Sequence, residues 1–206
     1  MLRALVLWLL DRLYTTFAWA YDVVAAAVSF GEWHDWGRCA LQFLPQRGRV
    51  LEIGHGPGHL FVALRACGID VVGVDRSWQM ARRLRERLRR AALAPALHAQ
   101  ADARALPFAD RCFDAAVWTF PTAAVFDAHT LRAVWRVLCP GGVWVIVLSA
   151  TPHARLLRAI YRLTGQSQRE VHAAQRRFAA AGFSVAHHVV RMRHASVSVF
   201  MLTRPS

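Results

Sequence analysis

The chain has 206 residues, of which 55% are hydrophobic and 19% are charged. This length fits one domain with a short appendage, and the composition excludes a chain that is disordered over most of its length. The formal net charge of +13 comes from 26 basic residues, all of them arginine. The densest basic run, 82–90, alternates with apolar residues at helical spacing, which predicts a solvated helix face rather than a nucleic-acid site.

Residues 1–30 begin the chain with a strongly apolar segment. Charges at Asp11, Arg12 and Asp22 interrupt it, so it has no run of about 20 apolar residues that would cross a membrane. The first apolar run is short and no cleavage site follows it, which argues against a signal peptide. The pattern predicts an amphipathic helix with Trp8 and Trp19 near its polar arc. Two interpretations stay open: the helix packs on the domain and covers the active site, or it also lies on a membrane and admits a lipophilic substrate.

These features give two regions, an N-terminal helical cap over 1–47 and a domain over 48–206. The four cysteines lie far apart in the sequence, so we expect reduced, buried thiols and no cysteine-based metal site. We expect a cytoplasmic protein whose residues 1–30 can reach the membrane periphery.

From residue 48 onward, short apolar runs alternate with helical stretches. Strands are expected at 49–53, 70–74, 96–101, 115–118, 143–148, 184–190 and 196–202, and helices at 60–66, 78–93, 128–138, 154–164 and 167–181. The alternation predicts an α/β fold with a mostly parallel sheet covered on both faces. The connection between the last two strands is too short for a crossover helix, which predicts an antiparallel end.

A glycine-rich loop follows the first expected strand. It reads Gly54-His55-Gly56-Pro57-Gly58, with the third glycine four positions after the first. The dinucleotide fingerprint GxGxxG needs it five positions after the first, and Pro57 has no N–H to offer a phosphate. The loop therefore indicates close approach of the backbone to a ligand, without matching a phosphate cradle.

Acidic residues follow the next two strands. Asp75 ends the second strand, where a carboxylate can accept hydrogen bonds from both ribose hydroxyls of a nucleoside; alternatively it caps the next helix, a role that Ser77 can fill. Asp102 and Ala103 follow the third strand, where a carboxylate and a backbone N–H can read the edge of an adenine. Ligands of open α/β sheets bind at the carboxyl ends of the strands, so this ordered set predicts a nucleoside site.

Taken in order, these motifs resemble those of the class I S-adenosylmethionine-dependent methyltransferases. The likeness covers about residues 48–148 and rests on Leu51-Glu52-Ile53-Gly54-His55-Gly56-Pro57-Gly58, Gly73-Val74-Asp75, Asp102-Ala103, Leu106-Pro107-Phe108, Phe113-Asp114 and Arg136-Val137-Leu138-Cys139-Pro140-Gly141-Gly142. It implies a Rossmann-like three-layer sandwich whose seven-stranded, mostly parallel sheet has an antiparallel C-terminal strand. It also implies S-adenosyl-L-methionine as the cofactor.

The resemblance further assigns roles to individual positions. Glu52, Gly54, Gly56 and Gly58 would hold the methionine end of the cofactor, with His55 as a further contact in the loop. Asp75 would bind the ribose, Arg76 and Met80 would line the adenine, and Asp102 and Ala103 would read its edge. Trp118 and Thr119, which end the fourth strand, would border the site of methyl transfer.

An upstream stretch adds a narrower likeness. Tyr21-Asp22, Ser29-Phe30-Gly31 and Trp36 resemble the N-terminal region of the menaquinone/ubiquinone C-methyltransferase branch. The likeness is partial, because the chain has Phe120-Pro121-Thr122-Ala123-Ala124 where that branch carries Phe-Gly-Leu-Arg-Asn. Together with the apolar N-terminus, it favours a small lipophilic acceptor such as a lipid or a quinone precursor.

A sulfonium methyl group is already a strong electrophile, so the protein's main task is to position the acceptor in line in a dry pocket. A base is needed only where the acceptor must lose a proton, and position favours His153 and His34 among the ten histidines. No spacing of histidines and carboxylates indicates a metal. The Asp/Asn-Pro-Pro-aromatic motif of the nucleic-acid amino methyltransferases is absent after the fourth strand, so nucleic acid is not expected as a partner. Two alternatives remain: a nicotinamide-dependent oxidoreductase, and a cofactor-binding partner protein without activity.

Overall fold

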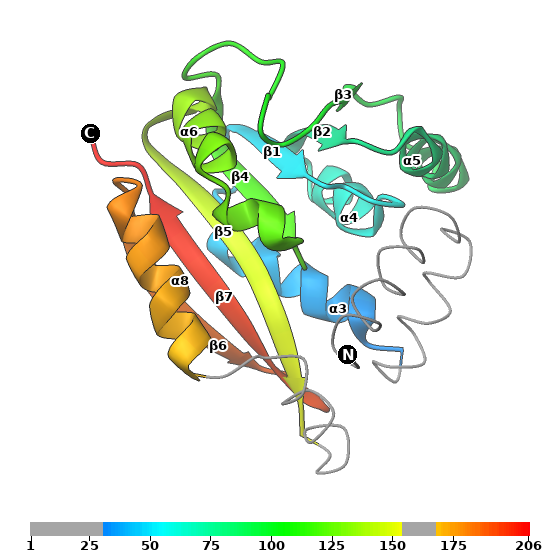
Figure 1. The fold of residues 1–206 in the computed structure, drawn as a ribbon. Coiled ribbons are helices and arrows are strands. Elements are labelled where there is room, and N and C mark those ends of the chain that lie inside the picture. The colour runs from blue at the N-terminus through cyan, green and yellow to red at the C-terminus, as the bar shows by residue number, and fades with distance from the viewer. Residues whose placement is uncertain (1–30, 154–167) are drawn as a thin grey trace, which may run out of the picture.

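The computed structural model describes residues 31–153 and 168–206, and these contain a seven-stranded sheet (Figure 1). The strands are β1 (Arg49–Ile53), β2 (Asp70–Asp75), β3 (His98–Gln100), β4 (Phe113–Thr119), β5 (Leu138–Pro152), β6 (Ser184–Arg191) and β7 (Ala195–Thr203). Their order across the sheet is β3-β2-β1-β4-β5-β7-β6. Strands β1 to β5 pair in parallel, and β7 runs antiparallel to both β5 and β6. The predicted fold class is confirmed.

Five α-helices and two short 3-10 helices accompany the sheet within the described residues. They are α3 (Trp33–Arg38), η1 (Cys39–Phe43), α4 (His59–Ala66), α5 (Trp78–Arg90), η2 (Ala123–Phe126), α6 (Ala128–Val137) and α8 (Gln168–Ala180). The amphipathic helix predicted within 1–30 and the helix predicted at 154–164 lie outside the described residues.

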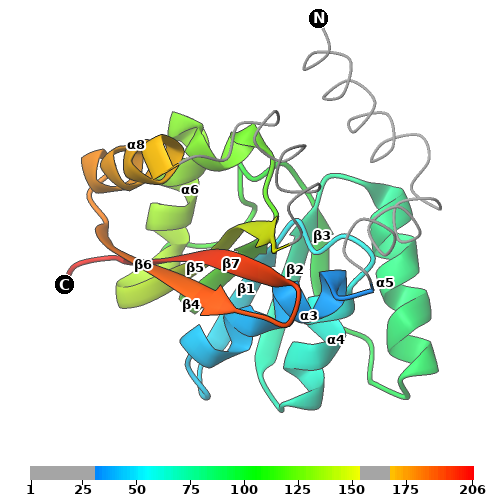
Figure 2. The same ribbon diagram turned by 90° about the horizontal axis from the view of Figure 1, so that it is seen from below.

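The helices form two layers, one on each face of the sheet (Figure 2). On one face α6 and α8 pack on a core that includes Ile53, Val134 and Phe178. On the other, α3, η1, α4 and α5 pack on a second core that includes Trp36 and Leu84. Because the inner strands are covered on both faces, their residues are apolar in unbroken runs.

Helix α3 and the following 3-10 turn belong to the second core rather than lying apart from the sheet. Trp36 and Ala40 are almost completely buried, beside Val50 of β1 and Val147 of β5. This part of the predicted cap, 33–44, is thus attached to the sheet by apolar contacts.

Helix α5 carries the densest basic run and shows why that run is compatible with folding. Its buried side chains include Ala81, Leu84 and Leu88, as the helical spacing predicts, together with Met80, and most of the arginines face outward. Ser77 caps the first turn by accepting a hydrogen bond from the Met80 amide at 3.4 Å. The helix ends before the predicted residue 93 because Ala92 adopts a left-handed conformation with φ 53°.

The largest difference from the predicted elements is the length of β5. It runs for 15 residues, because Leu138 at its start pairs with Phe113 of β4 and β7 pairs beside it from Val143↔Thr203 to Pro152↔Ala195. Long-range pairing of this kind leaves no short-range signal in the sequence.

The four cysteines are free, and the prediction that they are buried holds only for Cys39. Cys67 is exposed because it terminates α4 at the surface. Among the described residues, no helix is long and apolar enough to cross a bilayer.

Candidate active site

The loop after β1 turns tightly at the carboxyl edge of the sheet. Gly54 and Gly56 adopt φ values of 62° and 52°, a region that residues with a side chain rarely occupy. A Cβ at Gly54 would stand 2.8 Å from the Trp118 indole nitrogen, whereas a Cβ at Gly56 would meet nothing closer than the Gly54 carbonyl oxygen at 4.0 Å. Gly54 is therefore required for packing inside the protein, while Gly56, although buried, leaves room for a Cβ without a close contact.

Asp75, at the end of β2, joins this loop to the next one. One carboxylate oxygen accepts from the Gly56 amide at 2.9 Å and the other accepts from the Ser77 amide at 2.8 Å. The side chain is buried, yet it does not cap α5, because Ser77 does so. Each carboxylate oxygen can accept more than one hydrogen bond, so Asp75 can also serve a ligand at this edge.

Glu52 lies beneath the loop as a buried carboxyl group with unused capacity. Its side chain is 2% exposed, and its Oε2 has no hydrogen-bond partner among the described residues. Burial, and secondly the negative charge of Asp75, raise the pKa of Glu52 well above its ordinary value. A buried acceptor without a partner is costly, and a cationic ligand group at the loop would remove that cost.

The outer part of the predicted nucleoside site lies on the loops after β2 and β3. Asp102 is held by Arg104, whose guanidinium donates to both carboxylate oxygens at 2.9 and 2.7 Å. This pairing lowers the pKa of Asp102 to about 2, so the carboxylate is charged at neutral pH. Arg76 is exposed, and its carbonyl accepts from the Gln100 side chain at 3.2 Å. The pattern of strand ends did not single out Arg104, although it stands only two residues after Asp102.

Met80 and His55 differ from their predicted surroundings. Met80, in the first turn of α5, is fully buried, so in this structure its side chain offers no surface to an adenine. The His55 ring is also buried, 6.4 Å from the Phe61 ring and close above Gly73 of β2. Burial lowers the pKa of His55, and its Nδ1 lies 2.8 Å from the Gly56 carbonyl, which favours a neutral ring that donates to it. The His55 side chain thus supports the loop from beneath.

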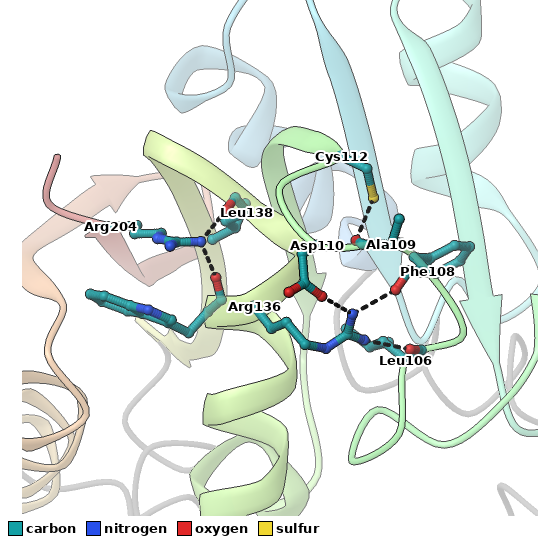
Figure 3. Close-up of polar contacts among 9 residues, drawn as sticks. Leu106, Phe108, Ala109, Asp110, Cys112, Arg136, Leu138 and Arg204 are labelled. Atoms are coloured by element: carbon teal, nitrogen blue, oxygen red, sulfur yellow. Dashed lines mark hydrogen bonds and ion pairs between the residues drawn. The ribbon is translucent and has the colours of Figure 1, made fainter.

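Arg136 fixes the connection between β3 and β4 that carries Asp102 and Ala103 (Figure 3). Its guanidinium donates to the carbonyls of Leu106 and Phe108 at 2.8 and 2.7 Å, and to the Asp110 carboxylate at 2.7 Å. Arg204 from the C-terminus donates to the Leu138 carbonyl and, at 2.8 Å, to the Trp135 carbonyl at the end of α6 (Figure 3). The motif that begins at Arg136 therefore has a structural role, and its contacts lie away from the glycine loop.

Helix α3 covers the end of β4. Gly37 faces Thr119, because a Cβ on Gly37 would stand 3.7 Å from the Thr119 methyl group. Trp33 stacks on Phe120 with ring centroids 4.1 Å apart. On the side of α4, His34 stacks on His59 at 3.3 Å, directly after the glycine loop. Of the two candidate bases, His34 therefore lies beside the loop.

His153 directly follows β5, beside the turn between β6 and β7. Thr119 pairs with Val147 of β5, and His153 follows six residues later, about 20 Å further along at roughly 3.3 Å per residue. Its Nε2 lies 3.1 Å from the Ser196 hydroxyl, on β7. Its amide donates to the His194 carbonyl at 2.8 Å, and the His194 ring lies 2.8 Å from Glu32 at the start of α3. His153 as a base therefore stays a prediction.

Within the described residues, no group of three or more histidine, cysteine or acidic side chains is arranged to hold a metal ion.

Comparisons with known proteins agree with this geometry. The family described as "Methyltransferase domain" matches residues 50–142. The ubiquinone/menaquinone biosynthesis C-methyltransferase UbiE of Geotalea uraniireducens is 31% identical over 159 residues, which cover 74% of this chain and 68% of that protein. The demethylmenaquinone methyltransferase of Roseiflexus sp. (strain RS-1) is 34% identical over 158 residues, which cover 72% of this chain and 63% of that protein.

Solved structures show the same fold at lower sequence identity. The YcgJ protein of Bacillus subtilis has a TM-score of 0.63 at 16% identity, covering 84% of this chain and all of that one. A Haemonchus contortus phosphoethanolamine N-methyltransferase, solved with phosphomonomethylethanolamine and S-adenosylhomocysteine, has a TM-score of 0.65 at 17% identity. That match covers 85% of this chain and 53% of the other.

Proposed function

The chain belongs to the class I S-adenosylmethionine-dependent methyltransferases, and we propose that it methylates a small lipophilic acceptor of the quinol type. The observation that carries the proposal is the glycine loop, where Gly56 donates to Asp75 and leaves room for a Cβ, beside a buried Glu52 oxygen without a partner among the described residues. The names of the quinone-related relatives support the choice of acceptor. Family membership sets aside the nicotinamide-dependent alternative.

The residues present fit the cofactor. Glu52 has an unpaired buried oxygen suited to the methionine ammonium group, and Asp75 has acceptor capacity for the ribose hydroxyls. Asp102 and Ala103 are proposed to meet the adenine edge, with Arg104 keeping Asp102 charged. When bound, S-adenosyl-L-methionine supplies a methyl group on a positively charged sulfur.

The protein's own contribution is to position the acceptor and to exclude water. We place the acceptor between α3 and the ends of β1 and β4, bordered by Trp118 and Thr119. In this position His34 is proposed to take a proton from an acceptor hydroxyl, which increases electron density on the acceptor carbon. The apolar cover over the sheet end lowers the local dielectric constant and keeps water from competing for the methyl group.

The acceptor is proposed to arrive from the membrane. Residues 1–30, which lie outside the described part of the chain, are proposed to contact the bilayer surface and to pass a lipophilic acceptor to the site.

The test is methyl transfer from S-adenosyl-L-methionine carrying a labelled methyl group, offered a bacterial lipid extract and a synthetic demethylated quinol in parallel. We expect label on a ring carbon of the quinol, identified by mass spectrometry. Binding of S-adenosylhomocysteine, measured by calorimetry, is run beside it. Binding without transfer to either acceptor would favour a cofactor-binding partner protein, and transfer only to another lipid class would refute the quinol.

A further inference from the structure

The chain carries a strained aromatic residue immediately after β4. Phe120 adopts φ 49°, a left-handed conformation that is strained for a bulky side chain. Its amide donates to the Val147 carbonyl at 2.8 Å, which fixes the backbone there. Strained residues of this kind concentrate at functional sites, and Phe120 directly follows Thr119, at the proposed methyl-transfer site.

The strained ring has a partner from a different part of the fold. Trp33 of α3 stacks on Phe120 at 4.1 Å, with the ring planes 29° apart. Both side chains are only partly buried, so the pair is not sealed in the core.

The position of Trp33 is set by contacts on both sides of it. The His194 Nδ1 lies at hydrogen-bonding distance, 2.8 Å, from a Glu32 carboxylate oxygen, which ties the start of α3 to the turn between β6 and β7. The Trp36 indole donates to the other Glu32 oxygen at 3.2 Å, and Gly37 lets the helix approach Thr119 closely. The aromatic pair is therefore held in place before any acceptor arrives, which reduces the entropy cost of binding.

We propose that Trp33 and Phe120 form an aromatic wall that selects acceptors with a flat aromatic ring, by stacking that ring against the pair. Stacking between aromatic rings depends on planarity, so a saturated ring of the same size gains less. An amine acceptor would need a carboxylate, and Glu32, next to Trp33, is already engaged by His194 and Trp36. The inference rests on the proposed function, because it names what the same site recognises.

The test measures binding rather than turnover, so that it does not depend on identifying the natural acceptor. The full chain is saturated with S-adenosylhomocysteine. It is then titrated with an aromatic diol, naphthalene-1,4-diol, and separately with the fully saturated decalin-1,4-diol. The wild-type protein should bind the aromatic diol at least about tenfold more tightly than the saturated one, a difference of about 1.4 kcal/mol.

Three variants separate recognition from structural support. Trp33→Leu keeps apolar volume but removes stacking and should weaken binding of the aromatic diol about tenfold; Trp33→Phe should stay within about threefold. Phe120→Gly removes the ring and relieves the backbone strain, so it should also weaken that binding without a large loss of stability. Affinity for S-adenosylhomocysteine should change by less than about threefold in all three.

A matched control comes from the other end of the sheet. Trp135 is also partly buried and packs edge-on against Phe183 at 4.9 Å, so Trp135→Leu removes a comparable ring far from α3. If Trp33→Leu and Trp135→Leu affect diol binding equally, or if the wild-type protein does not distinguish the two diols, the aromatic wall is refuted. If the wild-type chain does not bind S-adenosylhomocysteine, the proposed function itself is refuted.

Discussion

Substitution of Gly56 by valine is the most direct test of the glycine loop. The residue adopts φ 52°, so any side chain there costs roughly 1–2 kcal/mol of backbone strain, and a β-branched one costs at least that. The protein itself offers little steric resistance, because the nearest atom to a Cβ would be 4.0 Å away. The folded state should survive, while the valine side chain occupies the space assigned to the cofactor.

Gly68→Val supplies the matched control. Gly68 also has a positive φ, 78°, with nothing within 4 Å of a Cβ, but it lies before β2 at the opposite edge of the sheet. For a domain of this size each kcal/mol lowers Tm by about 2–4 °C, so both variants should melt several degrees below the wild type.

Calorimetric titration with S-adenosylhomocysteine should then separate the two variants. Gly56→Val should weaken binding by at least about 100-fold, which corresponds to about 2.7 kcal/mol, and Gly68→Val should leave it unchanged. Equal affinities in the two variants would show that Gly56 does not border the cofactor, whatever their stabilities.

Three further predictions concern neighbouring features. Asp75→Asn keeps only one acceptor oxygen, so it should weaken S-adenosylhomocysteine binding by about 10–100-fold, since a hydrogen bond to a charged group contributes about 1.5–3 kcal/mol; unchanged calorimetric affinity would reduce Asp75 to a loop brace. Because the pKa of Glu52 is raised, the folded chain keeps a proton that the unfolded chain releases above about pH 4.5. The free energy of unfolding of the wild type should therefore fall as the pH rises from about 4.5 to the pKa of Glu52 in the folded chain. Glu52→Gln should remove this fall, so in urea unfolding its stability relative to the wild type should increase with pH; parallel pH profiles would contradict a buried, protonated Glu52. Anionic liposomes should sediment the full chain, less at high salt, and should not sediment a chain beginning at Tyr21; a full chain that stays in the supernatant would remove the membrane as the source of the acceptor.

The sequence could predict that the acidic and glycine motifs share one site, because each motif lies at a strand end. The carboxyl ends of the strands of a parallel sheet meet at one edge. The apolar runs at 49–53 and 70–74 predicted β1 and β2 almost to the residue. Asp75 and the glycine loop then had to lie close together, and the Gly56 amide does donate to Asp75. The short link before β7 likewise predicted the antiparallel end.

Side-chain partners were less predictable, because they depend on packing between segments far apart in the chain. The spacing of Met80 did not show that α5 buries it completely, and the loop position of His55 did not show that its ring lies over Gly73. Nothing local indicated that Glu32 would pair with His194, which is 162 positions away.

The sequence by itself determined the fold class and the family, because apolar periodicity and the spacing of glycines and carboxylates are local properties that survive without knowledge of contacts. Only the tertiary structure decided which histidine lies near the glycine loop. The packing of α3 on β4 brings His34 beside the loop, whereas pairing with β7 extends β5 and places His153 against the turn between β6 and β7. The same packing places Trp33 on Phe120, a contact that arises from burial between distant segments and from no pattern within either of them.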